Sequence, residues 1–189
     1  ANDFLQKLVS NDLTRLKVGK MQYNLILNSQ GGIIDDCMVY RFEDKLICVV
    51  NGANKEKVLK WFLQNQAEGA DISDNSLQIS LIAIQGPQSA DIVCRVLGSR
   101  PKNLSYMSFY QDSLEGKDFF ISRSGYTAED GFEVYVNWQN ACGWWDAFIS
   151  AGEEFDITPC GLGSRDILRI EAGYPLYGHE IDASTNPYE

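Results

Sequence analysis

Histidine is almost absent from this sequence, and its scarcity narrows the chemistry that the chain can perform. His179 is the only histidine among 189 residues. A Ser-His-Asp triad, a paired-histidine metal site or a histidine proton shuttle within one chain is therefore excluded or rests on this single residue. General acid or base work falls to carboxylates or tyrosines.

Two other shortages exclude whole classes of partner. Positive charge is scarce, because 16 Lys and Arg stand against 26 Asp and Glu, and a formal charge of −10 has the wrong sign for binding a phosphate backbone. No apolar run approaches the about 18 residues of a membrane helix, and residues 1–13 lack the basic and apolar regions of a signal peptide. We predict neither nucleic acid nor a membrane as partner.

Cysteines are few, odd in number and widely spaced. This pattern indicates neither a disulfide framework nor a zinc site, and it favours a reducing compartment. No metal site of any kind is predicted. The five cysteines are Cys37, Cys48, Cys94, Cys142 and Cys160.

Strand-like and helix-like segments are interspersed along the chain, which predicts an α+β fold of mixed or antiparallel sheets with packed helices. Strands are expected over residues 21–27, 33–42, 45–50, 77–84, 119–122 and 132–136. Helices are expected over residues 4–9, 54–64, 88–97, 141–151 and 164–171. A polar linker is expected over residues 71–76, and residues 173–189 have turn chemistry and little periodicity.

The sequence GGIIDD, residues 31–36, ends in two neighbouring carboxylates. Alternation along a strand puts Asp35 and Asp36 on opposite faces. A carboxylate that faces the interior is costly unless it is paired or used. From these residues alone, an acid that caps the hairpin turn is the favoured interpretation, and a functional acid is the alternative.

Two further segments combine glycine-rich turns with a charged side chain. Glu133 has the strand parity of Gly131 and Tyr135 and opposes Phe132. An inward glutamate can accept two hydrogen bonds from a planar ring edge that presents an amide N–H beside an amino group, whereas an outward one is a solvated strand residue. Arg165 falls in the first turn of its helix, where a cation is unfavourable unless an anion or a structural ion-pair partner lies nearby.

Six separated motifs follow one another along the chain: GGIIDD, VVNGANKEK (49–57), LIAIQGPQS (81–89), SRSGYTAEDGFEVYV (122–136), PCGLGSRDILRIEAGYPLYGHEID (159–182) and TNPYE (185–189). Taken together and in this order, they resemble the glycine cleavage T-protein family over nearly the whole chain. The resemblance suggests the middle portion of that family's three-domain cloverleaf, with its N-terminal segment and C-terminal barrel absent, and hence an excised or truncated region of a longer protein. Residues 1–75 would be second-domain-like, and residues 76–189 the later part of the first, folate-binding domain.

The resemblance also implies an activity, aminomethyl transfer in glycine catabolism. In that family, tetrahydrofolate accepts a methylene from the aminomethyl group on the lipoyl arm of H-protein, and ammonia is released. The implied partners are lipoylated H-protein and folate, and the chain itself would be a monomer or weakly self-associating. The implied location is the bacterial cytoplasm or the mitochondrial matrix.

The family's functional residues match six positions of this sequence. Asp36 matches the key aspartate that lies near the reacting pterin nitrogens, and the resemblance gives it the catalytic role. Glu133 matches the pterin-recognising glutamate. The other matches, all to positions that bind or line the folate site, are Arg165, Asn51, Tyr126 and Tyr23.

One departure from the family pattern falls in the motif around Glu133. The family pattern GYTGEDG has glycine where this chain has Ala128. If that position needs a positive φ, alanine strains the loop. Two alternative functions remain open: another folate-dependent member of the superfamily, such as a demethylase or the folate portion of a sarcosine or dimethylglycine dehydrogenase, and a non-catalytic folate-binding scaffold. The KGCYxGQE-type signature of such scaffolds is absent.

Overall fold

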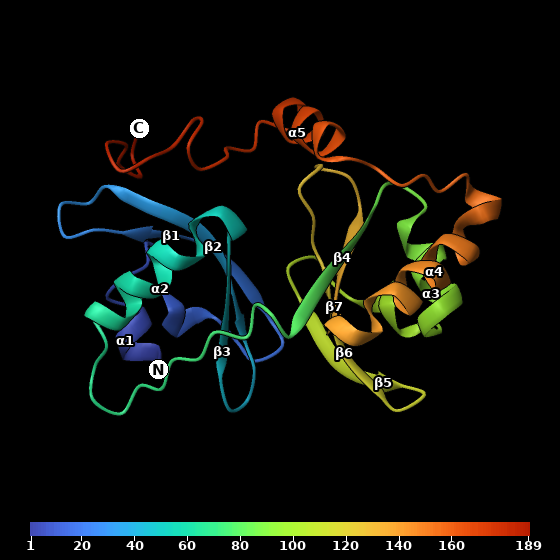
Figure 1. The fold of residues 1–189 in the computed structure, drawn as a ribbon, viewed down its shortest axis with the longest axis horizontal. Coiled ribbons are helices and arrows are strands. Elements are labelled where there is room, and N and C mark those ends of the chain that lie inside the picture. Colours follow the sequence, from blue (N-terminus) through green and yellow to red (C-terminus); the bar gives the residue numbers. More distant parts are fainter. The chain divides into compact units, whose positions relative to one another are not determined.

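The computed structural model describes residues 1–189 and has the predicted α+β architecture, with two antiparallel sheets (Figure 1). The chain divides into two compact units. Unit 1 comprises residues 1–74 and 175–189, and unit 2 comprises residues 75–174. The first change of unit therefore falls within the predicted polar linker, while the last fifteen residues group with unit 1.

Unit 1 is built on a three-stranded sheet in the order β1-β2-β3. Its strands are β1 (Met21–Leu27), β2 (Ile33–Arg41) and β3 (Leu46–Val50). The turn between β1 and β2 is capped by Asn28, whose side-chain oxygen accepts from the backbone N–H groups of Gln30 and Gly32. The meander predicted from the strand periodicity is confirmed.

The helices α1 (Asn2–Leu5) and α2 (Lys55–Gln64) belong to the same unit and share a hydrophobic core with this sheet (Figure 1). Val58 and Phe62, one turn apart on α2, are buried, and burial of each such side chain contributes about 1.5–3 kcal/mol. The core that they join contains Phe4, Leu5, Leu8, Val9, Leu13, Leu16, Ile26, Ile34, Cys37, Val39 and Ala70.

The prediction of a helix over residues 4–9 is wrong at its C-terminal end, because α1 ends at Leu5. The following residues turn onto the edge of β1 instead. Val9 forms an isolated bridge with Ile26, and the backbone N–H of Leu27 donates to the carbonyl of Leu8 at 2.9 Å. Local apolar spacing favours a helix here, but pairing with the strand edge overrides it.

Unit 2 is built on a four-stranded sheet in the order β4-β7-β6-β5. Helices α3 (Ser89–Leu97) and α4 (Ala141–Gly152) contact each other and this sheet, and Figure 1 shows them on one of its faces. Helix α5 (Leu162–Glu171) completes the unit. The strands are β4 (Ile79–Gln85), β5 (Phe109–Leu114), β6 (Lys117–Arg123) and β7 (Gly131–Asn137).

Strand β5 was not predicted, although it pairs with β6 along its whole length. The two strands are joined by Glu115 and Gly116, both with positive φ, of 52° and 75°. A two-residue turn of this kind favours Asn-Gly or Asp-Gly, so Glu-Gly gives a weak signal. The polar residues of β5 also obscure its alternation.

Residues 175–189 contain no helix or strand, as their composition indicates, yet they are held onto unit 1. The backbone N–H of Ile33 donates to the carbonyl of Thr185 at 3.1 Å. Lys57 of α2 places its ammonium 3.8 Å from the centre of the Tyr177 ring. These contacts account for the grouping of the C-terminal segment with the first sheet rather than with α5.

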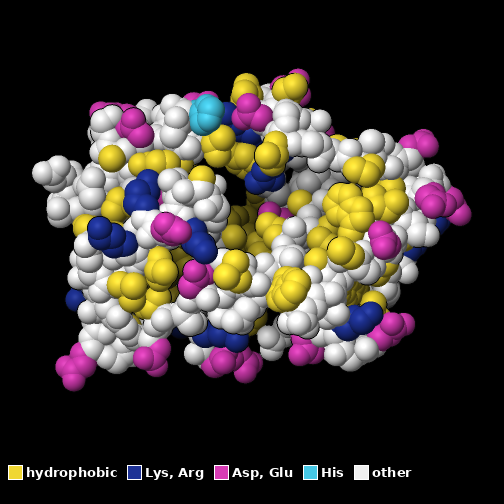
Figure 2. Space-filling model, in the orientation of Figure 1, with side chains coloured by type: hydrophobic (Ala, Val, Ile, Leu, Met, Phe, Trp, Pro, Cys, Tyr) yellow, Lys and Arg dark blue, Asp and Glu magenta, His cyan; other side chains and the backbone are white.

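Apolar side chains are exposed on α5, and Figure 2 shows hydrophobic groups on the surface at that helix. Leu162 is 84% exposed, Ile167 61% and Ile170 55%, while Arg169 on the same helix is buried. Helix α5 thus exposes an apolar surface of a kind that proteins usually bury. None of the helices is both long enough and apolar enough to cross a membrane.

Candidate functional site

The first group of predicted site residues lies in unit 1, on neighbouring strands. Asp36 on β2 pairs with Leu25 of β1, so Tyr23, two residues along, is its diagonal neighbour on the same face. The phenol of Tyr23 forms a hydrogen bond with the carboxylate of Asp36. Asn51 is the residue directly after β3, and its side-chain nitrogen donates a hydrogen bond to Asp36.

Asn51 connects the two neighbouring carboxylates. Its side-chain nitrogen donates to Oδ1 of Asp36 at 2.6 Å and to Oδ1 of Asp35 at 2.9 Å. The backbone N–H of Asn51 donates to Oδ2 of Asp35 at 3.2 Å, and Asn54 Nδ2 donates to Oδ1 at 3.0 Å. Asp35 is fully buried, so these hydrogen bonds compensate its desolvation.

The interpretation of the aspartate pair as a cap of the hairpin turn is wrong. Asn28 caps that turn, whereas Asp35 ties β2 to the segment that leads from β3 into α2. The predicted separation of the two carboxylates onto opposite faces is confirmed by their exposure, because Asp35 is buried and Asp36 is partly exposed.

The environment of Asp36 raises the pKa of its carboxyl group above the ordinary value. Burial is the main cause, and the negative charge of Asp35 adds to it. The hydrogen bonds from Asn51 and Tyr23 act in the opposite direction, because they stabilise the ionised form. The result is a carboxylate whose remaining acceptor capacity can serve a ligand or a reacting proton.

The second group lies in unit 2, around Glu133 on β7. Glu133 pairs with Ser122 of β6 and Ala83 of β4, and its neighbours Phe132 and Val134 point into the core. Glu133 lies on the opposite face of β7 from these two residues, as its strand parity predicts, and it is only partly exposed there. Ser124 Oγ donates to Glu133 Oε2 at 2.5 Å.

Burial raises the pKa of Glu133, while the Ser124 hydrogen bond and the charge of Arg165 lower it. Arg165 on α5 lies above the Tyr126 ring, with its guanidinium carbon 4.6 Å from the ring centre. Tyr126 in turn stacks on Tyr174 at a centroid distance of 5.7 Å. The structure therefore brings Glu133, Arg165 and Tyr126 together.

The loop between β6 and β7 carries Tyr126 and is held at several points. Gln85 donates its side-chain amide to the carbonyl groups of Ser124, at 3.2 Å, and Phe132, at 3.3 Å. Arg123 forms a two-point ion pair with Asp130, at 2.8 and 2.7 Å.

Within this loop, Ala128 has φ of 59°. This position therefore has the positive φ that glycine adopts freely, and the backbone strain predicted for alanine is present.

Several neighbours of the two groups were missed by the sequence analysis. Ser124 and Tyr106 interact with Glu133, Tyr174 forms a hydrogen bond with Tyr106, and Asn54 lies against Asp35. Ser124 is the one with a usable signal, because it directly precedes the Gly-Tyr pair of the motif. The others depend on contacts between distant segments, which periodicity does not reveal.

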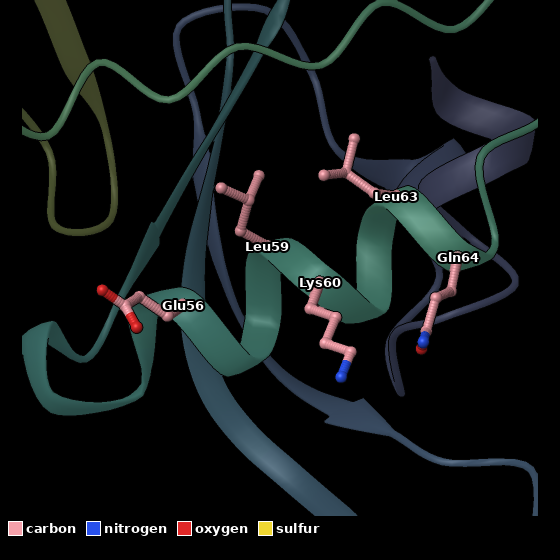
Figure 3. A pocket seen from close by; sticks show the side chains of 5 residues that line it. All are labelled: Glu56, Leu59, Lys60, Leu63 and Gln64. Carbon is pink, nitrogen blue, oxygen red and sulfur yellow. The ribbon is translucent and has the colours of Figure 1, made fainter.

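A shallow surface hollow along α2 contains none of the predicted site residues (Figure 3). Leu59 and Leu63 lie one turn apart and point to the same side of it. Its remaining lining residues are Glu56, Lys60 and Gln64, so it offers no convergent polar groups. No group of three or more His, Cys, Asp or Glu side chains is arranged to hold a metal ion.

Comparison with known proteins identifies the family. The family model described as the GCVT N-terminal domain matches residues 1–189. An aminomethyltransferase of Chloroherpeton thalassium is 44% identical over 191 residues, covering 100% of this chain and 53% of its own length. An aminomethyltransferase of Thermotoga neapolitana is 40% identical, covering 99% of this chain and 52% of its own length.

A solved structure gives the same result for the fold. The crystal structure of glycine cleavage system aminomethyltransferase T from Bartonella henselae has a TM-score of 0.85 and 30% sequence identity, covering 98% of this chain and 50% of that one. The α+β fold of this chain thus matches about half of that aminomethyltransferase. The chain belongs to the GCVT N-terminal domain family, and it spans about half the length of the curated relatives that it matches.

Proposed function

We propose that this chain is the tetrahydrofolate-handling part of an aminomethyltransferase of the glycine cleavage system. The observation that carries the proposal is the Glu133 group, a partly buried carboxylate with a fixed hydroxyl donor, a nearby arginine and stacked tyrosines. The names of the relatives support the same activity.

The Glu133 group suits the edge and the face of a pterin ring. An ionised carboxylate only accepts hydrogen bonds, and a pterin presents a ring N–H beside an amino group, both donors. Tyr126 and Tyr174 offer aromatic surface for a planar ring, and Arg165 keeps positive charge near the carboxylate. The residues present therefore fit this ligand.

The Asp36 group has a different task in this proposal. Bound tetrahydrofolate supplies the nucleophilic nitrogen that takes up the methylene, so the protein need not form a covalent bond. Asp36, oriented by Asn51 and Tyr23, holds a proton or a partial positive charge at that nitrogen. Proximity and orientation then supply most of the rate acceleration, in keeping with a chain that has one histidine.

The methylene donor in this proposal is the aminomethyl group on the lipoyl arm of H-protein, which would also be the macromolecular partner. The predicted location, the bacterial cytoplasm or a mitochondrial matrix, goes with that partner and stays a prediction.

The proposal is tested by titrating the chain with tetrahydrofolate by calorimetry under anaerobic, reducing conditions. The aminomethyltransferase of Chloroherpeton thalassium is the positive control. Glu133→Gln should weaken binding about tenfold or more, because a ring donor then meets an amide in place of a carboxylate. Asp36→Asn should largely spare binding, and Glu129→Gln, at an exposed glutamate of the same loop, should leave it unchanged.

Aminomethyl transfer from lipoylated H-protein is the second measurement, made with the corresponding substitutions in that relative. Asp36→Asn should there lower the turnover rate far more than the affinity for folate. Binding of tetrahydrofolate by neither the wild-type chain nor the relative would overturn the folate proposal. Equal effects of Glu133→Gln and Glu129→Gln would remove Glu133 from the site.

A further inference from the structure

Two buried serine hydroxyls form a chain of hydrogen bonds that ends at the carboxylate of Glu133. Ser124 Oγ donates to Glu133 Oε2 at 2.5 Å, and Ser122 Oγ lies 2.8 Å from Ser124 Oγ. Ser122 is 0% exposed and Ser124 is 2% exposed, so water cannot replace either contact. Burying a hydroxyl costs free energy unless it is hydrogen-bonded, and these two hydroxyls, on β6 and directly after it, form hydrogen bonds that lead to one carboxylate.

The direction of the hydrogen bonds in this pair follows from counting protons. A serine hydroxyl has one hydrogen to donate. Ser124 gives its hydrogen to Glu133, because an ionised carboxylate can only accept. Ser122 must therefore be the donor and Ser124 the acceptor in the contact between the two hydroxyls. Hydrogen bonds that run in one direction polarise each other, so Ser122 strengthens the donor at Ser124.

The backbone around Ser124 holds its hydroxyl in place. The N–H of Ser124 donates to the carbonyl of Gly131 at 3.0 Å, and its own carbonyl accepts from Gln85 Nε2 at 3.2 Å. Ser122 is fixed by the β6–β7 register, in which it pairs with Glu133 directly. The pair is thus part of the sheet framework.

We propose that Ser122 and Ser124 are positioning residues for Glu133. The pair commits Oε2 of Glu133 to an internal donor, favours the ionised form of the carboxylate and leaves Oε1 for the ligand. Glu133 then discriminates in favour of a ring edge that presents N–H donors and against one that presents acceptors. This inference rests on the proposed function for the identity of the ligand, but not for the state of Glu133.

Other groups also act on the titration of Glu133 and must be held constant. The positive charge of Arg165 favours the ionised form, and Tyr106 interacts electrostatically with Glu133. Neither is altered by substitution of a serine. A serine-to-alanine change removes a neutral hydroxyl, so it changes the hydrogen bond to Glu133 without changing the charge of the site.

The test is a carbon-13 NMR titration of the Glu133 carboxyl group in the 189-residue chain, without ligand. Ser124→Ala should raise the pKa of Glu133, because the hydrogen bond from Ser124 favours the ionised form. Ser122→Ala should raise it by a smaller amount, since it removes only the polarising donor. Ser89→Ala is the matched control, because Ser89 is equally buried but donates to the Asp130 carbonyl.

Tetrahydrofolate affinity is the second measurement. Ser124→Ala should weaken binding about three- to tenfold, the effect of one hydrogen bond, and the loss should grow as the pH falls from 8 to 5.5. Ser124→Thr, which keeps the hydroxyl, should restore both the titration and the affinity. If Ser124→Ala does not fold, Ser122→Ala and Ser124→Thr still decide the outcome.

Identical Glu133 titrations in Ser124→Ala, Ser122→Ala and Ser89→Ala would overturn the inference. A raised pKa with normal tetrahydrofolate affinity at every pH would overturn the positioning role. If the wild-type chain and the relative both fail to bind tetrahydrofolate, the proposed function falls, and the titration alone still supports or overturns control of Glu133 by the serine pair.

Discussion

The side-chain nitrogen of Asn51 lies 2.6 Å from the carboxylate of Asp36. The same nitrogen donates its other hydrogen to Asp35, so the amide has no choice of orientation. Its oxygen must point away from the two carboxylates, since it would otherwise face acceptors. Asn51 is thus a fixed connector between a fully buried aspartate and the predicted catalytic one.

Replacement of Asn51 by alanine tests this connection. Asn51→Ala should raise the pKa of Asp36 further, because it removes a hydrogen bond that favours the ionised form. It should also destabilise unit 1 by about 1–3 kcal/mol, since Asp35 loses a donor in a buried setting. Carbon-13 titration of the Asp36 carboxyl and hydrogen exchange of the β2 amides would measure the two effects.

Asn54→Ala is the matched control, because Asn54 donates to Asp35 alone. We expect it to cost a similar free energy of unfolding but to leave the titration of Asp36 unchanged. A shift of the Asp36 titration that is equal in the two variants would show that the connection does not run through Asn51.

The strained alanine in the loop between β6 and β7 gives a second prediction. Ala128 has φ of 59°, a conformation that alanine adopts at a cost and glycine adopts freely. Ala128→Gly should therefore stabilise unit 2 by about 1 kcal/mol. Urea denaturation would measure the gain. Ala147→Gly, in the middle of α4, should instead cost about 1 kcal/mol, and a loss of stability in both variants would contradict the strain.

The sequence predicted the fold well where periodicity and burial agree. The alternation of residues around Glu133 predicted that Glu133 and Phe132 lie on opposite faces of their strand. One face of β7 does pack into the core, and Phe132 is on it. The same rule separated Asp35 from Asp36. Prediction was wrong for residues 6–9, whose spacing favours a helix while pairing with β1 decides the structure. It missed β5, whose Glu-Gly turn lacks the usual residues.

The candidate site was predictable only in part, for a related reason. The resemblance pointed to Glu133, Arg165 and Asp36, whereas the residues that set their state come from contacts across the sheets. Asn54 reaches Asp35 from the start of α2, and Ser122 reaches Glu133 through strand register. Such contacts follow from tertiary packing, which no local pattern records. Asn54, Ser122 and Ser124 therefore became visible as partners of these carboxylates only in the structure.

The raised pKa of Glu133 gives a third prediction, on the pH dependence of stability. A carboxyl whose pKa is higher in the folded than in the unfolded protein contributes stability below the unfolded value, which is lost as the pH rises through the folded value. Above the unfolded value, the folded environment of Glu133 therefore costs free energy, because burial opposes ionisation. Glu133→Gln should stabilise unit 2 by about 0.5–2 kcal/mol at pH 7.

The gain from Glu133→Gln should disappear near pH 3, where the carboxyl is neutral in both states. Urea denaturation at the two pH values measures the difference, and Glu129→Gln, at an exposed position, supplies the baseline. A variant that is more stable yet binds less folate would separate the functional loss from unfolding. Destabilisation at pH 7 would refute the assignment of a net burial cost to Glu133.

The last prediction concerns Gly32, where the hairpin of unit 1 meets the C-terminal segment. A Cβ at Gly32 would lie 2.1 Å from the backbone oxygen of Ala183, so Gly32→Ala must displace that segment. The hydrogen bond from Ile33 to Thr185 should break, and the Ile33 amide should exchange with solvent roughly tenfold or more faster in NMR. Gly52→Ala, which meets no atom within 4 Å, should leave that rate unchanged. Unchanged Ile33 exchange in Gly32→Ala would mean that the segment is not held there.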